Sequence, residues 1–183
     1  MISQEEYIQL KAFARQDGLL IGALWIITFG CFVGSMSAPD IQIGFIAGVI
    51  ATPFVMYYRL KRFRNNILGG SISYGRALTF CLLTTAYASL IIAAATMIYM
   101  TFFDDGMLMS TLQRNITMPE MQQSLKQAGM DPEKLETQLA EMGRLRPIDF
   151  TFSIFFNCII TSGLMAIVIA LAGKRQKRQE QSN

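Results

Sequence analysis

Side chains that could do chemistry are scarce in this 183-residue chain. There is no histidine, which excludes imidazole metal sites, Ser-His-Asp triads and Cys-His pairs. The cysteines Cys31, Cys81 and Cys158 are far apart and have no metal-type spacing. We therefore expect them to be small apolar side chains in a packed interior rather than a redox pair. The sequence predicts no catalytic residue, no metal site and no cofactor.

The acidic residues give only a weak indication of chemistry. Asp104 and Asp105 stand together at the end of an apolar stretch, where they could bind a cation or form a solvated helix end. An enzyme that acts on lipid-linked substrates would need converging acids at one membrane face, and only Asp149 could join this pair. We expect a protein that is not an enzyme.

Methionines are concentrated in a polar segment, residues 104–147, which holds six of the twelve. Met107 and Met109 are the close pair there outside the predicted helices, and thioethers could hold a soft cation such as Cu(I). No cysteine or histidine accompanies them. Adaptable apolar packing against lipid, the helices or a partner is therefore the favoured interpretation.

These few groups are set among four apolar windows, residues 18–38, 41–58, 77–103 and 148–172, of which only the last contains a charge, at its start. A helix needs about 20 residues to cross about 30 Å of hydrocarbon, and backbone groups in lipid must bond internally. The sequence predicts an all-α integral membrane four-helix bundle, a single domain over residues 1–183. Its net charge of +3 does not indicate nucleic acid binding.

Basic residues set the expected orientation. Eleven of the 16 Lys and Arg residues lie before the first window, between the second and third, or after the fourth. The positive-inside rule then predicts cytoplasmic termini, a cytoplasmic loop 59–76 and an insert 104–147 on the opposite side of the membrane. The tail cations are Lys174, Arg175, Lys177 and Arg178.

The insert 104–147 is expected to form a short helical hairpin. Thr117 and Glu120 have the spacing of a capping box at the start of the first helix. Asp131 precedes a proline and is placed to begin the second helix. We expect the apolar face of the first helix to contact lipid, the bundle or a partner. That face is formed by Met118, Met121 and Leu125.

Small residues recur at four-residue spacing within the windows, the pattern by which membrane helices pack closely. The three GxxxG matches are Gly18/Gly22, Gly30/Gly34 and Gly44/Gly48. Asn157 and Thr161 are the principal polar candidates inside the fourth window. They could hydrogen-bond across helices or line a ligand cavity, and the sequence leaves both alternatives open.

The loop 59–76 is the most distinctive stretch of the chain. Its cations could anchor the protein on the anionic inner leaflet, at about 1 kcal/mol each, or recognise a phosphate headgroup. A glycine pair in a predicted turn comes next, ahead of the third window. The candidate lipid or partner contacts here are Arg59, Lys61, Arg62, Arg64, Gly69, Gly70, Tyr74 and Arg76.

The block from Gly69 to Ala77, GGSISYGRA, resembles a Gly-Gly-x-Ile-Ser-Phe/Tyr-Gly-x-Ala/Phe block of an uncharacterised membrane family, domain of unknown function 4199. Ser71 departs from the aromatic residue expected there. The resemblance implies a four-span protein of the bacterial inner membrane, of the kind found mostly in Bacteroidetes, with a periplasmic insert 104–147. It offers no catalytic residues to transfer. It also implies an accessory role beside a membrane glycosyltransferase of the polyprenyl-phosphate type.

Two functions are therefore expected. The first is a non-catalytic accessory or scaffolding subunit that contacts membrane lipids and either a membrane protein partner or a second copy of itself. The alternative is a small lipid-handling or transport protein with a site among the helices, near Asn157 and Thr161.

Overall fold

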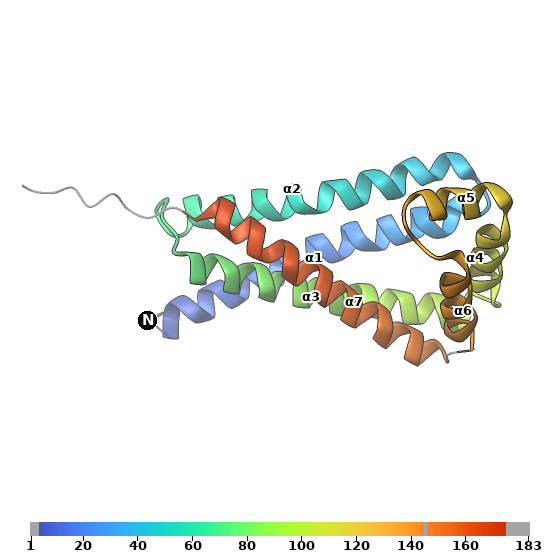
Figure 1. Ribbon diagram of the computed structural model, residues 1–183. Coiled ribbons are helices and arrows are strands. Elements are labelled where there is room, and N and C mark those ends of the chain that lie inside the picture. The colour runs from blue at the N-terminus through green and yellow to red at the C-terminus, as the bar shows by residue number, and fades with distance from the viewer. Residues whose placement is uncertain (1–3, 145, 175–183) are drawn as a thin grey trace, which may run out of the picture. The chain divides into compact units, whose positions relative to one another are not determined.

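The computed structural model describes residues 4–144 and 146–174 of the chain. Every regular element in this part is a helix, which confirms the all-α prediction (Figure 1). The tail cations Arg175, Lys177 and Arg178 lie outside the described residues. The elements are α1 (Gln4–Ser35), η1 (Pro39–Ile41), α2 (Gln42–Asn66), α3 (Tyr74–Phe102), α4 (Met107–Thr117), α5 (Pro119–Gln127), α6 (Pro132–Met142) and α7 (Pro147–Gly173).

Four segments are long and apolar enough to cross a membrane: α1, the η1–α2 segment, α3 and α7. The four apolar windows of the sequence fall on these segments. The chain is therefore a multi-pass membrane protein. It divides into two compact units, Met1–Ile92 with Phe155–Asn183, and Ala93–Ile154. Helices α3 and α7 each contribute to both units, which we describe separately.

The first unit begins with an antiparallel hairpin of α1 and α2, which lie side by side (Figure 1). The connection is short because η1 carries Pro39 at its start and leads directly into α2. The indole Nε1 of Trp25 donates to Thr52 Oγ1 across the hairpin, at 3.3 Å. The rings of Phe32 and Phe45 pack with their centroids 5.3 Å apart.

Small residues allow the helices of this unit to approach closely, as the GxxxG pattern predicts. A Cβ on Gly48 would lie 2.9 Å from Thr28 Cβ, and one on Gly22 would lie 2.9 Å from Ile91 Cβ. A Cβ on Gly18 would meet Tyr87 Cβ at 2.5 Å. Gly30 differs, since among the described residues a Cβ there would meet no atom within 4 Å. Gly34 of the same match is close to Ile41, since a Cβ there would lie 3.4 Å from Ile41 Cδ1, so only one of the two glycines lies at a contact.

The core of the first unit extends beyond the apolar windows, toward the end of the hairpin opposite η1. Leu10 of α1 and Leu60 of α2 are fully buried there. Phe63 stacks on Phe80 of α3 with ring centroids 4.6 Å apart. Helix α1 starts well before residue 18. Leu10, on the polar N-terminal part of α1, is buried in the same cluster as residues of α2 and α3. A charge-free window thus predicts which residues fit in the hydrocarbon of a membrane. It does not predict where the helix begins or ends.

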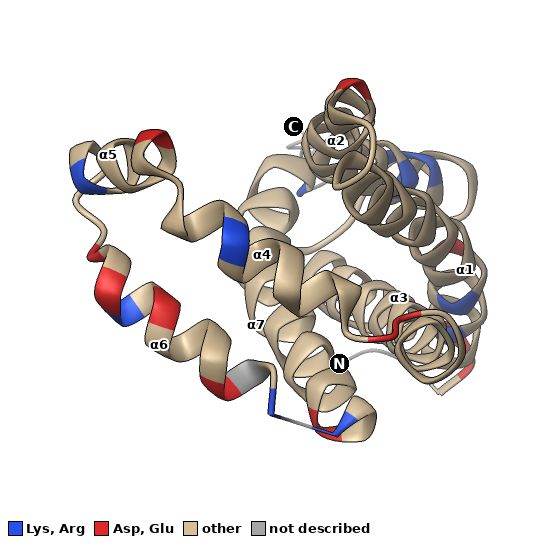
Figure 2. Ribbon diagram, turned by 90° about the vertical axis from the view of Figure 1, so that its right-hand side faces the viewer, with Lys and Arg blue, Asp and Glu red and all other residues tan. Residues whose placement is uncertain are grey.

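The second unit contains three short helices where the sequence predicts two. Helix α4 was not foreseen. Its first turn is held by Asp104, whose Oδ1 accepts from the backbone N–H of Leu108 at 2.8 Å. Asp131 caps α6 as predicted, accepting from the backbone N–H of Glu133 at 3.2 Å. Acidic and basic residues are interspersed on α5 and α6 (Figure 2).

The predicted capping box at Thr117 is wrong. Residue Thr117 is the last residue of α4, and its hydroxyl donates to the carbonyl oxygen of Arg114 at 2.8 Å. Met118 occupies the N-cap position of α5 without a side-chain hydrogen bond. The proline at position 119 explains this start, because proline is favoured in the first turn of a helix and disfavours helical geometry at the residue before it.

Candidate functional site

The cations of the segment 59–76 divide into two groups by burial and pairing. Arg59 belongs to the paired group. Its Nε donates to Asp17 Oδ1 at 2.6 Å, its Nη2 contacts the same oxygen, and the Asp17 side chain is 3% exposed. This ion pair joins α1 to α2 at the point where the uncharged part of each helix ends. Both charges are therefore neutralised within the hairpin.

Arg64 is also structural. It is 7% exposed, and its Nη1 donates to the carbonyl oxygen of Gly173 at 2.9 Å. The last carbonyls of a helix have no partner within that helix, so this contact satisfies one of them at the end of α7. Arg76 in turn reaches Glu6 Oε2 through Nη2 at 2.6 Å. Three of the predicted lipid or partner contacts therefore bind other parts of the chain.

Lys61 and Arg62 form the second group. Both are exposed, and neither has a hydrogen-bond or ion-pair partner in the described part of the chain. They are the two cations of this segment that remain available to an external anion.

The remaining predicted residues of this segment shape the turn into α3. Gly69 and Gly70 both have positive φ, 64° and 88°, a conformation that glycine adopts at little cost. The backbone N–H of Gly70 donates to the carbonyl oxygen of Arg64 at 2.9 Å and closes the end of α2. Tyr74 packs against the core of the first unit. These residues position α3 and the cations rather than forming a binding surface themselves.

A small cavity lies at the polar ends of α1 and α2, with a volume of about 110 Å³; we call it the α1–α2 cavity. Its polar lining comprises the ion pair of Asp17 with Arg59, the free guanidinium of Arg62, and two amides. Phe13, Phe63 and Ile67 form its apolar part. The full lining is Phe13, Gln16, Asp17, Arg59, Arg62, Phe63, Asn66 and Ile67.

Asn157 and Thr161 lie together on α7 but not in an interior site. Thr161 Oγ1 donates to Asn157 Oδ1 at 3.2 Å, and both side chains are exposed. The residues of α7 that pack into the first unit are small ones one helical face away, including Ser162, Ala166 and Ala170. The alternative that Asn157 and Thr161 line a cavity among the helices is therefore not what the structure describes.

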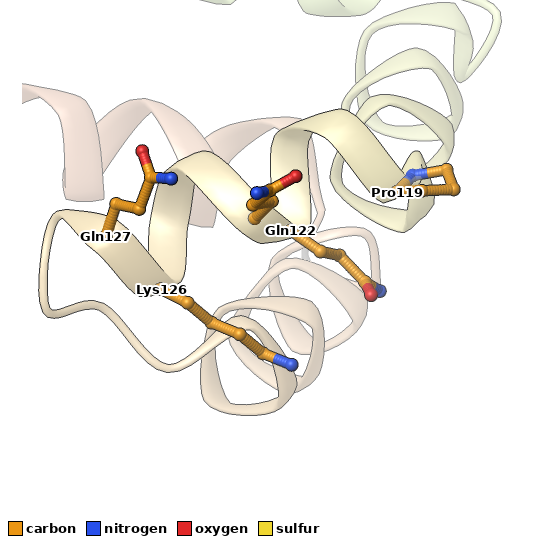
Figure 3. A pocket seen from close by; sticks show the side chains of 5 residues that line it. Pro119, Gln122, Lys126 and Gln127 are labelled. Carbon is orange, nitrogen blue, oxygen red and sulfur yellow. The ribbon is translucent and has the colours of Figure 1, made fainter.

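The predicted apolar face of the insert is only partly exposed. Met118 and Met121 are 46% and 43% exposed, whereas Leu125 is buried in the second unit. A hollow of about 520 Å³ lies beside α5 and is lined by Pro119, Gln122, Gln123, Lys126 and Gln127. Figure 3 shows Lys126 and Gln127 pointing away from each other. Because these side chains come from a single helix and do not point toward a common centre, the hollow beside α5 is not a convincing ligand site.

Groups that could do chemistry do not gather in the described ranges, 4–144 and 146–174. No three Cys, Asp or Glu side chains lie close enough there to hold a metal ion. Arg146 Nε donates to Asp149 Oδ2 at 2.8 Å, and this hydrogen bond raises the pKa of the exposed Arg146 guanidinium. That pair is a solvent-exposed contact at the start of α7.

Asp17 is the important residue that sequence reasoning missed. It lies just outside the first charge-free window, next to Gly18. A signal for it was present. The hairpin turns near residue 38, and Asp17 and Arg59 are equidistant from that point in the sequence. A tight antiparallel connection therefore brings their opposite charges to the same level.

The fold defines a class, that of small multi-pass helical membrane proteins. Residues 16–175 match the family model described as protein of unknown function (DUF4199), and the chain belongs to this family. The match extends from the residue before Asp17 through the end of α7. Comparisons with curated proteins and with solved structures gave no significant match.

Proposed function

We propose that this protein is a non-catalytic accessory or scaffolding subunit of a complex in the bacterial inner membrane. In this arrangement both termini and the segment 59–76 face the cytoplasm, as the distribution of basic residues favours. The partner implied by the resemblance of the block at Gly69 is a membrane glycosyltransferase of the polyprenyl-phosphate type.

One observation carries the proposal, the exposed Asn157–Thr161 pair on α7. Its side chains hydrogen-bond to each other within one helix, at 3.2 Å, and the amide nitrogen of Asn157 has no acceptor among the described residues. Apolar side chains surround the pair on the same exposed face, among them Ile160 and Leu164. A polar amide on a lipid-facing surface is unfavourable, and membrane helices commonly satisfy such groups across a helix–helix contact. The pair therefore supports a contact with a helix of another membrane protein.

The exposed cations support a second, weaker contact. Lys61 and Arg62 lie at the end of α2 and face outward. In the proposed orientation they meet the anionic inner leaflet or an acidic surface of the partner. Met118 and Met121 on the insert offer an adaptable apolar surface at the periplasmic side.

The experiment is purification of the tagged full chain from its native membrane in a mild detergent, followed by mass spectrometry of the proteins retained. The test variant is Asn157→Leu with Thr161→Val, which removes the polar groups and keeps the side chains similar in size. The control is Phe54→Leu, at a residue on α2 that is 70% exposed. We expect one membrane enzyme at constant ratio with the parent and the control, and its loss with the double variant.

Three results would contradict the proposal. One is the absence of any retained membrane protein. Another is retention of only a second copy of this chain, which would make the polar pair a self-association contact. The third is full retention of the enzyme by the double variant, which would show that the Asn157–Thr161 pair is not the contact with the partner.

A further inference from the structure

The α1–α2 cavity is lined by Arg62, a cation that is unpaired among the described residues, and lies at the edge of the first two apolar windows. Asp17 directly precedes the first window, and Arg59 directly follows the second. Phospholipid headgroups occupy this level of a bilayer, next to the hydrocarbon. We propose that the α1–α2 cavity binds the phosphate group of an anionic phospholipid, with Arg62 as its principal ligand.

The charge of the cavity favours an anion. The positive charge of Arg59 is balanced by the negative charge of Asp17, so this ion pair contributes no net charge. Arg62 is the remaining charged group of the lining, and no carboxylate pairs with it in the described residues. A guanidinium presents several N–H groups in one plane, a geometry that matches two phosphate oxygens.

Neutral donors accompany this cation. Gln16 of α1 and Asn66 of α2 both line the cavity. Each side-chain amide carries two N–H donors, which can bind the phosphate oxygens that Arg62 does not reach. Arg62 and Asn66 are four residues apart on α2 and therefore lie on the same side of that helix. The donors thus come from both helices of the hairpin and border a single space.

The size of the cavity fits a phosphate group, and its apolar part favours a lipid as the molecule that carries this group. Its volume of about 110 Å³ compares with about 30 Å³ for one water molecule in the liquid, so it holds a phosphate-sized group but not a nucleotide. Phe13, Phe63 and Ile67 form the rest of the lining. An apolar wall beside a phosphate site suits the glycerol and upper acyl chain of a phospholipid.

The test is titration of the delipidated full chain in detergent with dihexanoyl-phosphatidylglycerol, with bound lipid counted by native mass spectrometry. Dihexanoylglycerol serves as the lipid without phosphate. The test variant is Arg62→Gln. Its control is Lys61→Gln, which removes the same charge from the neighbouring exposed residue and does not line the cavity. Within the described residues neither side chain has an internal partner to lose, so both variants are expected to fold.

We expect one phosphatidylglycerol per chain, with at least tenfold weaker binding for Arg62→Gln and less than a twofold change for Lys61→Gln. Dihexanoylglycerol should not bind at this site. Equal weakening by both variants would overturn the proposal, because the lipid would then bind the basic surface in general. Unchanged binding by Arg62→Gln would overturn it as well.

A third arm separates the lipid from a free anion. The same titration is made with inorganic phosphate, which we expect to bind at least tenfold more weakly than the lipid. Binding of inorganic phosphate but not of phosphatidylglycerol, lost in Arg62→Gln, would overturn the lipid assignment. Lipid binding is measured here on the isolated chain, so its outcome is independent of whether a protein partner exists.

Discussion

Arg64 donates a hydrogen bond to the carbonyl oxygen of Gly173, which lies 109 residues further along the chain. The contact joins the end of α2 to the end of α7 within the first unit. Leu60, one turn earlier on α2, approaches the same glycine so closely that a Cβ at position 173 would collide with its side chain. The end of α7 is therefore fixed by one buried cation and one buried leucine.

Replacement of Arg64 by Gln should lower the free energy of unfolding by about 1–3 kcal/mol, because the carbonyl of Gly173 loses its buried donor. The matched variant Arg62→Gln should change it by less than about 0.5 kcal/mol, since Arg62 is exposed and unpaired in the described residues. Denaturant unfolding in detergent micelles measures both. Equal stability of the two variants would contradict the structural role of Arg64.

The Asp17–Arg59 pair makes a non-additive prediction. Asp17→Asn and Arg59→Gln should each destabilise the protein by about 3 kcal/mol, because each leaves a poorly solvated charge without its partner. The double variant carries neither charge and should be more stable than the sum of the two single effects predicts. A double-mutant cycle on unfolding free energies measures the coupling, and strictly additive effects would rule out a direct pair.

The glycines of the α1–α2 hairpin provide a comparison of one substitution in two environments. Gly48→Ala should destabilise by about 1–3 kcal/mol, because its new Cβ would lie 2.9 Å from Thr28 Cβ. Gly30→Ala should be neutral or slightly stabilising, since nothing lies within 4 Å and alanine is the better helix former. Thermal unfolding of the two variants side by side tests this difference. A lower melting temperature for Gly30→Ala than for Gly48→Ala would refute it.

The proposed orientation predicts a difference in thiol labelling. A cysteine placed at Lys61 should react with a membrane-impermeant maleimide only after the inner membrane is opened. A cysteine at Gln123 should react once the outer membrane alone is permeable. Both positions are exposed, and the unsubstituted protein gives the background from its three cysteines. The reverse pattern would place the termini outside the cytoplasm.

The number and placement of the long helices follow from the sequence because hydrophobicity alone decides which segments fit a bilayer. The roles of the cations do not follow from it. Arg62 and Arg64 are two residues apart, about 200° around the helix, so one faces outward when the other faces inward. Which of them is buried depends on α7, which returns to the end of α2 only after more than a hundred residues. A double substitution of Arg62 and Arg64 would therefore change two properties at once, the surface that Arg62 offers to a ligand and the stability that Arg64 contributes.

The short helix α4 escaped prediction for a related reason. Asp104 and Asp105 could be read as a solvated end of the third window, and they are followed by a glycine. Only the structure identifies Asp104 Oδ1 as the acceptor for the N–H of Leu108 in the next helix. The orientation of Asn157 was equally hidden, because periodicity gives the faces of α7 without saying which one packs. Small residues at Ser162 and Ala166 were the available signal.

The tight α1–α2 hairpin also has a consequence for biosynthesis. Asp17, Arg59 and the glycine contacts between these helices all lie within the first 66 residues, so they can form while α3 and α7 are still being synthesised. A slip of one helical turn between the two helices would separate the opposite charges and move Thr28 away from Gly48. These contacts thus fix the register of α1 against α2 before the later helices are made. The hairpin can then enter the bilayer as a pair of helices to which α3 and α7 are added.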